Sequence, residues 1–396
     1  MDMGAEADEH GKFFAKRHVP FDALPGAHRV EALGQESGLR ARTIFVMRTD
    51  WPQYRENDQG TGNKDFENLV TPATVGGLAP VWTAPTSCCY VAPVVAGGVV
   101  YLSTYSAMTA LDARSGGLLW STAPGDVVDL RPTVADGRVF AGHVHVYAFD
   151  TASGHLLWDH PPPADGIFAG SSLVWRGEVL VPGTSFVAAL DEETGRTIWS
   201  LGTGYTDQLV LDDGIIYFRA VGLQNAWIDA VDARSGKLLW QSQEIGANWS
   251  VGPIVTDHAV FALGGSAVFA FDKRHGGILW TTPLLSPGHI AEAHGLLYAS
   301  ASDQLVALKA DDGTIAWTIP ADQYADWALP AVAGGVLYAR TTADGMSAYD
   351  AQTGTFLWTS NLGVGVGISA PVIVDGYLYF AADDYLLHAY ALPDTT

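Results

Sequence analysis

Tryptophan recurs along this 396-residue chain at a nearly constant interval, and this repeat restricts the fold more than any other feature. Successive members of the series lie 38, 38, 41, 41, 40, 37 and 41 residues apart. Seven of the eight follow a glycine by four positions, and six follow an aspartate by eight. Short apolar runs with a period near 40 are typical of a β-propeller with one four-stranded blade per repeat. The series consists of Trp82, Trp120, Trp158, Trp199, Trp240, Trp280, Trp317 and Trp358.

The two ends of the repeat predict how the propeller closes. The last repeat, from Pro371 to Leu392, has three strand patterns and no tryptophan strand, whereas the first tryptophan strand (78–82) has no three strands before it. Because closure removes exposed sheet edges, we expect these fragments to form one blade. The sequence therefore predicts an all-β, eight-bladed propeller over residues 51–396. Residues 1–50 lack the repeat, and we expect them to form an irregular N-terminal extension.

The charge of the chain is strongly unbalanced, with 21 basic and 43 acidic residues and a net charge of −22. Residues 51–396 hold 14 basic and 35 acidic residues, a surface that repels nucleic acid, although solubility alone also explains the acidity. The sequence contains no run of 18 apolar residues, so no membrane-spanning helix is predicted. The chain as given begins without a signal-peptide pattern, and its only cysteines are the adjacent pair Cys88 and Cys89. Both observations favour a cytoplasmic protein.

A ring of polar and aromatic residues is predicted at the mouth of the central channel. Counting back six and eight residues from the turn that ends each innermost strand gives equivalent positions in every blade. Among these positions are Arg131, Gln208 and His289, together with Asp129 and Trp327. Such a mixed lining suits a concave site for a small ligand.

Within this lining His289 is the natural general acid or base, since imidazole titrates near neutrality. Asp129 or Asp326 would orient it or share the proton transfer, and Glu292 is a further candidate. A purely structural histidine is the alternative. His143 and His145 resemble a metal-ligand pair, but no cysteine or acidic cluster lies beside them in the sequence, so no metal site is predicted.

Side chains suited to binding also lie in the predicted channel face. Three of the 14 basic residues of the propeller, Arg131, Arg219 and Arg340, fall there and suggest a carboxylate or phosphate ligand. Pairing with local aspartates is the alternative. Aromatic side chains in the same connections suit stacking on a planar or apolar ligand, namely Tyr90, Tyr205, Trp249 and Trp327.

The repeated Asp-x-x-x-Gly-x-x-x-Trp pattern resembles the pyrroloquinoline-quinone propeller repeat of quinoprotein alcohol dehydrogenases. Trp51-Pro52-Gln53-Tyr54 and the stretch 69–78 are similar to the opening segment common in that family. The resemblance spans residues 51–392, implies an eight-bladed propeller, and extends to cofactor-free members such as the outer-membrane assembly lipoprotein B. The dehydrogenases carry a vicinal disulfide packed on the quinone, which makes Cys88 and Cys89 redox candidates.

Two departures from the dehydrogenases are visible. Blades of 37 to 41 residues leave no room for the insertions that wall in the quinone, and no residues match the family's calcium ligands and catalytic aspartate. Three hypotheses therefore stand. The first is a small-molecule site at the channel mouth, either of a binding protein or of an enzyme that needs no cofactor. The second is a protein-binding scaffold of the assembly-factor type, and the third is an oxidoreductase with pyrroloquinoline quinone and calcium.

Overall fold

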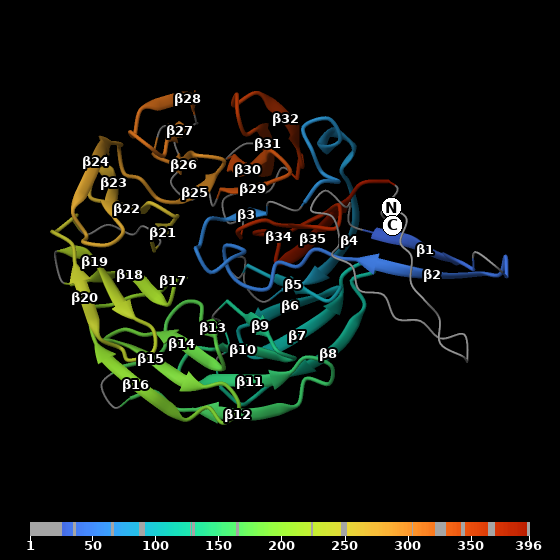
Figure 1. The fold of residues 1–396 in the computed structure, drawn as a ribbon, viewed down its shortest axis with the longest axis horizontal. Coiled ribbons are helices and arrows are strands. Elements are labelled where there is room, and N and C mark those ends of the chain that lie inside the picture. The colour runs from blue at the N-terminus through green and yellow to red at the C-terminus, as the bar shows by residue number, and fades with distance from the viewer. Residues whose placement is uncertain are drawn as a thin grey trace.

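The chain was analysed as a computed structural model, in which a closed ring of blades surrounds a central axis (Figure 1). The structure describes residues 26–34, 37–64, 67–86, 92–126, 128, 131–163, 166–222, 225–246, 252–302, 304–320, 330–341, 345–362 and 369–393.

Eight antiparallel sheets form the blades, and the first-named strand of each lies innermost. Blade 1 contains β5 (Val94–Ala96), β6 (Val99–Thr104), β7 (Ala107–Asp112) and β8 (Leu118–Thr122). Blade 2 contains β9 (Thr133–Ala135), β10 (Arg138–Gly142), β11 (Val146–Asp150) and β12 (Leu156–His160). Blade 3 contains β13 (Leu173–Trp175), β14 (Glu178–Pro182), β15 (Phe186–Asp191) and β16 (Thr197–Gly202). Blade 4 contains β17 (Leu209–Asp212), β18 (Ile215–Val221), β19 (Ala226–Asp232) and β20 (Leu238–Gln241).

The second half of the ring repeats this order. Blade 5 contains β21 (Ile254–Val255), β22 (Ala259–Gly264), β23 (Ala267–Asp272) and β24 (Ile278–Pro283). Blade 6 contains β25 (Ile290–Ala293), β26 (Leu296–Ser300), β27 (Gln304–Lys309) and β28 (Ile315–Pro320). Blade 7 contains β29 (Ala331–Ala333), β30 (Val336–Thr341), β31 (Gly345–Asp350) and β32 (Phe356–Thr359), and the short β3 (Asn63–Lys64) pairs in parallel with β29.

Blade 8 joins the two ends of the propeller. Its inner strands are β33 (Val372–Val374), β34 (Tyr377–Ala381) and β35 (Leu386–Ala391), and its outer strand is β4 (Ala79–Pro85). Ala389 of β35 lies opposite Trp82 of β4. The predicted eight-bladed closure is confirmed. The 3₁₀ turn η1 (Val75–Gly77) leads into β4.

The repeated tryptophan and glycine hold neighbouring blades together. Seven indole N–H groups donate to a backbone carbonyl of the next blade at 2.9–3.2 Å. Each ring also covers the glycine of that blade's turn. Gly195, for example, has φ of +69°, and a Cβ there would lie 2.7 Å from Trp158. Only glycine adopts this positive φ and also leaves room for the tryptophan ring without an energetic cost. These two requirements explain why glycine keeps a fixed spacing from tryptophan.

The outermost strands share a β-bulge next to the tryptophan. In blade 2, Ala148 faces Trp158 while Phe149 faces Leu156, so Leu157 is the extra residue. A bulge breaks the alternation of side chains between the two faces. Consecutive apolar residues such as Leu156 and Leu157 are therefore both exposed on the rim.

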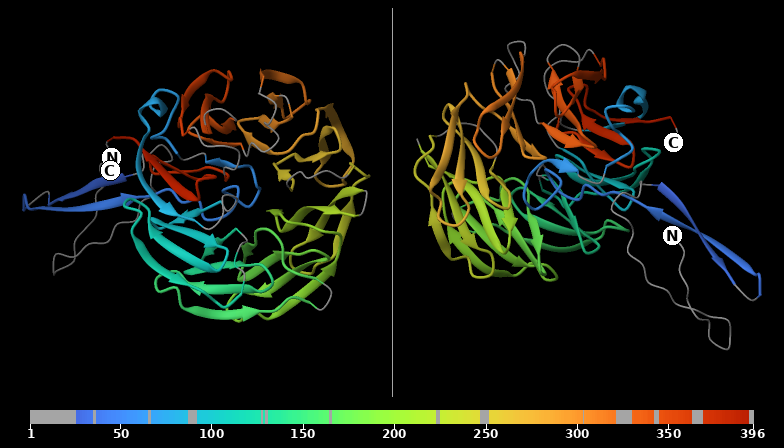
Figure 2. Two further views of the ribbon diagram at one scale, coloured as in Figure 1. Left: turned by 180° about the vertical axis from the view of Figure 1, so that it is seen from behind. Right: turned by 45° about the horizontal axis from the view of Figure 1, so that its top comes forward.

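Residues 26–47 lie within the extension that was expected to be irregular, and in this part that expectation is wrong. They form a hairpin of β1 (Gly26–Leu33) and β2 (Arg40–Met47) that projects away from the blades (Figures 1 and 2). β2 contains the run 43–46, Thr-Ile-Phe-Val, whose β-branched and aromatic residues favour a strand. Glu31 accepts hydrogen bonds at 2.9 Å from both Arg40 and Arg42. None of the helices in the described ranges has the length and apolar character to cross a membrane.

Candidate functional site

The segment of residues 48–64 lies inside the central channel and follows the innermost strands around it. Backbone N–H groups of six blades donate to its carbonyls at 2.7–3.1 Å. The donors occupy equivalent positions, two residues before the turn that ends each innermost strand. They are Val95 to Trp51, Val134 to Pro52, Leu211 to Asp58, Val255 to Gln59, Glu292 to Thr61 and Val332 to Gly62. The chain therefore closes the turn end of its own channel.

Side chains fix both ends of this channel segment. The backbone N–H of Thr49 donates to Asp375 of blade 8 at 2.7 Å, and the N–H of Asp375 donates back to the Thr49 hydroxyl at 3.0 Å. Near the other end, Lys64 forms an ion pair with Glu56 at 2.8 Å. In between, Gly60 has φ of +66°, and a Cβ there would lie 2.6 Å from Val210. The segment is packed tightly against blade 4.

Arg55 carries a buried positive charge to the middle of the channel. Its guanidinium donates to the carbonyl of Gly252 at 3.2 Å, to the side-chain oxygen of Gln208 at 3.5 Å, and to the carbonyl of Ile290. Burial lowers its pKa to about 10, and the neighbouring Arg131 contributes to that decrease. The arginine thus ties the channel segment to blades 4, 5 and 6.

The structure brings together three of the predicted channel residues around this segment. The guanidinium of Arg131 lies 3.9 Å from the centre of the Tyr54 ring, a cation–π contact. Gln208 contacts Arg55, and both Arg55 and Arg131 act electrostatically on His289. Their polarity therefore has a structural explanation, because they hold Tyr54 and Arg55 in place.

His289 does not titrate near neutrality, contrary to the expectation from its sequence. Burial, followed by the charges of Arg55 and Arg131, lowers its pKa to about 3. Its ring is neutral at physiological pH, so it is a poor general acid and a weak base. Its Nδ1 has no hydrogen-bond partner in the described part of the chain.

Asp207 is a buried carboxyl beside these arginines. Burial raises its pKa, and Arg131, Arg219 and Arg55, in that order, oppose the increase. Arg219 of β18 is buried, and Tyr205 is half-exposed and pairs through its backbone with Val221. Arg340 lies buried in β30. The predicted Arg219 and Tyr205 therefore join the cluster through Asp207, a residue that the count from the turns did not select.

Several predicted site residues lie outside the described residues, and the structure does not place them. These are Cys88, Cys89, Tyr90, Asp129, Trp249, Asp326 and Trp327. The proposed partners of His289 in acid–base chemistry are thus not located. Glu292 lies in β25, and its N–H belongs to the bonds that hold the channel segment.

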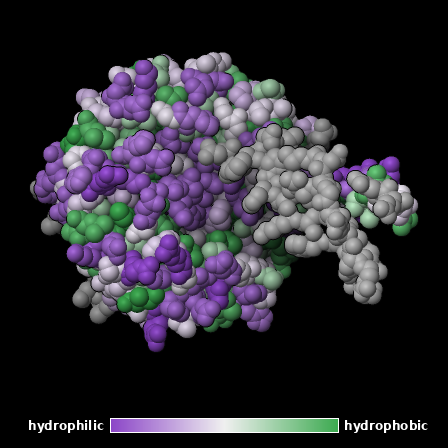
Figure 3. Space-filling model, viewed as in Figure 1, coloured by the Kyte–Doolittle hydropathy of each residue, from purple (hydrophilic) through white to green (hydrophobic). Residues whose placement is uncertain are grey.

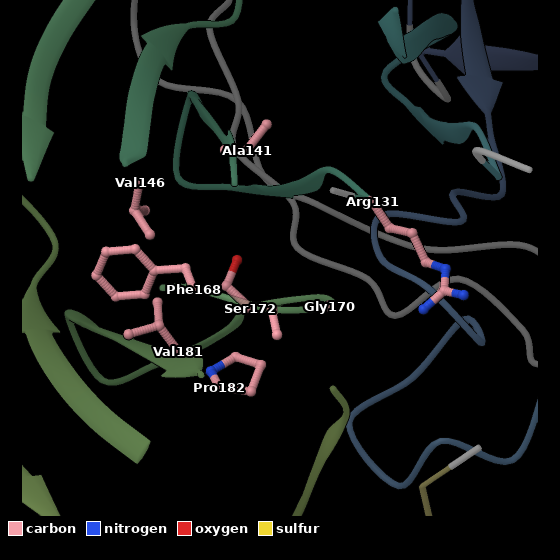
Figure 4. A pocket seen from close by; sticks show the side chains of 10 residues that line it. Arg131, Ala141, Val146, Phe168, Gly170, Ser172, Val181 and Pro182 are labelled. Atoms are coloured by element: carbon pink, nitrogen blue, oxygen red, sulfur yellow. The ribbon is translucent and has the colours of Figure 1, made fainter. Parts of the chain in front are cut away.

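Two small recesses open along the channel wall. One offers only about 20 Å³ to water and lies between blades 2 and 3; Phe168 and Val181 line its apolar end, and Arg131 points away toward the channel segment (Figure 4). The other, of about 10 Å³, is lined by Tyr54, Arg55 and His289. The hydroxyl of Tyr54 has no hydrogen-bond partner among the residues described.

A site for pyrroloquinoline quinone with calcium is not located in the described part of the channel. Arg55 occupies part of that channel through its contacts with Gln208, Gly252 and Ile290, and the guanidinium of Arg131 covers the Tyr54 ring. Calcium takes six to eight oxygen ligands, usually including carboxylates. Within the described ranges, no group of three or more histidine, cysteine, aspartate or glutamate side chains could hold a metal ion.

Sequence reasoning missed the role of residues 51–64, because Arg55 and Lys64 precede the first blade and were not assigned to the channel. A usable signal exists in the stretch 57–63, Asn-Asp-Gln-Gly-Thr-Gly-Asn. Gly60 and Gly62 both adopt a φ of +66°. A polar, glycine-rich stretch with no strand pattern is suited to a segment that bonds through its backbone.

Comparison with known proteins places this fold among relatives of different function. Residues 74–219, 224–326 and 305–394 match the family described as outer membrane protein assembly factor BamB. BamB of Yersinia pestis is 26% identical over 316 residues, which cover 71% of this chain and 79% of that protein. Tetrathionate hydrolase of Acidithiobacillus ferrooxidans is 27% identical over 332 residues, covering 74% of this chain and 63% of the enzyme.

Among solved structures, quinohemoprotein alcohol dehydrogenase of Comamonas testosteroni superposes with a TM-score of 0.71 at 18% identity, over 87% of this chain and 80% of that one. Identity at this level supports the shared fold alone. The match to the family covers most of the repeat region. The chain therefore belongs to the propeller family of the outer membrane protein assembly factor BamB.

Proposed function

We propose that this protein is a binding scaffold for another protein and that its working surface is the outside of the propeller. The observation that carries the proposal is the channel segment. Backbone N–H groups from the innermost strands of six blades donate hydrogen bonds to carbonyls of residues 51–62. Arg131, Gln208 and His289, which were predicted to line a ligand site, contact or surround this segment. A channel closed in this way favours binding at the rim.

The rim supports the same proposal. Apolar side chains are more than one-third exposed on the outermost strands of all eight blades. Hydrophobic residues gather at the edge of the face in Figure 3, while its middle is mainly hydrophilic. Exposed apolar surface of this kind is typical of protein interfaces. The residues are Val81, Leu118, Leu119, Leu156, Leu157, Ile198, Leu238, Leu239, Ile278, Leu279, Ile315 and Phe356.

The test compares rim and channel variants in capture of partners from the cells that make the protein. The rim variants are Leu239→Glu and Leu279→Glu, at exposed positions of β20 and β24. The channel variants are Arg131→Met and His289→Gln. The proposal expects one stoichiometric partner that the channel variants retain and at least one rim variant loses. Loss on channel variation alone, with the melting temperature unchanged, contradicts it.

A second candidate is a site for a small anion in the channel. It is favoured by the guanidinium groups of Arg55 and Arg131, which lie close enough together in the channel to act on one another, on Asp207 and on His289. Guanidinium groups bind carboxylate and phosphate. Such a site would bind the anion without a reaction that uses His289 as an acid or base, because this side chain stays neutral at physiological pH.

Thermal shift experiments separate this candidate from the quinoprotein hypothesis. Citrate and phosphate that raise the melting temperature of the wild type, but not of Arg131→Met, would support the anion site. Pyrroloquinoline quinone with calcium is expected to leave the melting temperature unchanged. A shift of several degrees with the quinone would instead favour an oxidoreductase.

A further inference from the structure

One buried carboxyl group breaks the pattern of the repeat. Asp229 lies in β19 immediately before Ala230, the residue that faces the repeat tryptophan Trp240. Its side chain is 4% exposed. The other seven blades place no carboxyl group at the equivalent position. The residues there are Thr109, Tyr147, Ala188, Phe269, Val306, Ser347 and His388.

Neutral donors hold the Asp229 carboxylate in one orientation. The side-chain amide of Gln241 in β20 donates to Oδ1 at 2.8 Å. The hydroxyl of Thr203, which follows β16 of blade 3, donates to Oδ2 at 3.5 Å. The indole of Trp227 also acts on this carboxylate. A carboxylate offers about four acceptor positions, so these three groups leave room for another donor.

The described part of the chain supplies no cation to this carboxylate. No described lysine, arginine or histidine lies within 4.0 Å of its oxygens. Burial raises the pKa of Asp229, while Gln241, Trp227 and Thr203 oppose the increase. Buried carboxylates in proteins are usually paired with a cation or kept neutral. This one lacks its counter-ion within the described chain.

A groove at the boundary of blades 3 and 4 leads to Asp229. It offers about 440 Å³ to water, and residues of β16, β19 and β20 line it. Leu201, Leu238 and the indole of Trp227 make its walls apolar. Gly202 lines it without a side chain, and nothing lies within 4 Å of the place its Cβ would take.

We propose that this groove binds an arginine side chain of a partner protein, with the Asp229 carboxylate as counter-ion and the Trp227 ring as a wall. The inference rests on the proposed scaffold function and names the chemistry of the partner. A guanidinium is planar, stacks on indole and pairs with carboxylate, so it matches both features of the groove. The strongly acidic propeller also attracts a basic segment from a distance.

The test measures binding of three pentapeptides, Gly-Gly-Xaa-Gly-Gly with blocked ends, to the full chain by isothermal titration. Xaa is arginine, lysine or citrulline, the last being the neutral isostere of arginine. The proposal expects the arginine peptide to bind at least about tenfold more tightly than the citrulline peptide. Equal binding of the arginine and citrulline peptides overturns the proposal. So does the absence of binding of the arginine peptide at 10 mM, which is roughly the weakest affinity expected of a single ion pair.

Two variants locate the binding. Asp229→Asn keeps the shape of the side chain and should weaken the arginine peptide about tenfold or more, whereas Asp257→Asn makes the same charge change at an exposed turn and should have no effect. Melting temperatures check that both variants fold. The wild-type comparison of arginine with citrulline needs no variant, so it decides the matter if Asp229→Asn is unstable.

The outcomes also separate this site from the scaffold function. A lysine peptide that binds as tightly as the arginine peptide overturns the assignment to a guanidinium. Failure of all three peptides overturns the groove, while partner capture lost in Leu239→Glu or Leu279→Glu would still support a scaffold that uses another part of the rim.

Discussion

Replacing Gly60 by alanine tests the packing of the channel segment directly. Gly60 has φ of +66°, and an added Cβ would lie 2.6 Å from the Val210 side chain, well inside van der Waals contact. The left-handed conformation costs a residue other than glycine about 1–2 kcal/mol. Overpacking adds about 1–3 kcal/mol. Gly60→Ala should therefore lower the free energy of unfolding by about 2–5 kcal/mol.

Gly177→Ala is the matched control. Gly177 lies in the turn after β13 with φ of +80°, and nothing lies within 4 Å of its added Cβ. It shares the conformational cost and the effect of alanine on the unfolded chain, so the difference between the variants isolates the contact with blade 4. Scanning calorimetry should place Gly60→Ala about 1–4 °C below Gly177→Ala, given about 2 cal/mol/K of unfolding entropy per residue. Equal melting temperatures would refute the tight packing of residue 60.

Three further expectations follow from the fold and the site. Gly195→Ala should have a lower melting temperature than Gly137→Ala, since both glycines have positive φ but only a Cβ at residue 195 would collide with the Trp158 ring. Equal melting temperatures in calorimetry would show that the tryptophan–glycine contact does not hold the blades together. The pKa of His289 is about 3 in the folded protein against 6.5 in the unfolded chain, so between these pH values the unfolded chain binds more protons and stability falls as pH falls from 6.5 toward 3. Denaturant titrations should find that the stability of His289→Gln falls less steeply over this range, and an unchanged slope would contradict the lowered pKa. Removal of residues 1–47 should leave the melting temperature within about 1 °C, since the described hydrogen bonds of the hairpin lie within it; a larger drop would show that the extension stabilises the propeller.

The sequence was sufficient to predict the ring of blades and its closure, because each repeat carries the same contacts. The spacing of glycine before tryptophan reflects one interaction between neighbouring blades, seen at Gly195 and Trp158 and repeated around the ring. The fragment containing Trp82 could be assigned to the last blade for the same reason. Local patterns repeated eight times leave few alternatives.

The candidate site was less predictable, because it depends on a segment without a repeat. Counting from the turns did bring Arg131, Gln208 and His289 together, but nothing in the spacing revealed that Arg55 would enter between them. The lowered pKa of His289 follows from that burial and from two nearby guanidinium groups, which no local pattern records. Asp229 differs: an alignment of the eight repeats by their tryptophans shows it as the one carboxylate at its position.

Hydrogen–deuterium exchange of the innermost strands tests the closed channel most directly. Mass spectrometry with residue-level fragmentation should find slow exchange at the amides that donate to the channel segment, for example Val95, Leu211 and Val332. Val174 occupies the equivalent position in blade 3, and no described carbonyl of the segment accepts its N–H, so it should exchange much faster. Fast exchange at all of these positions would contradict a channel closed by residues 51–62.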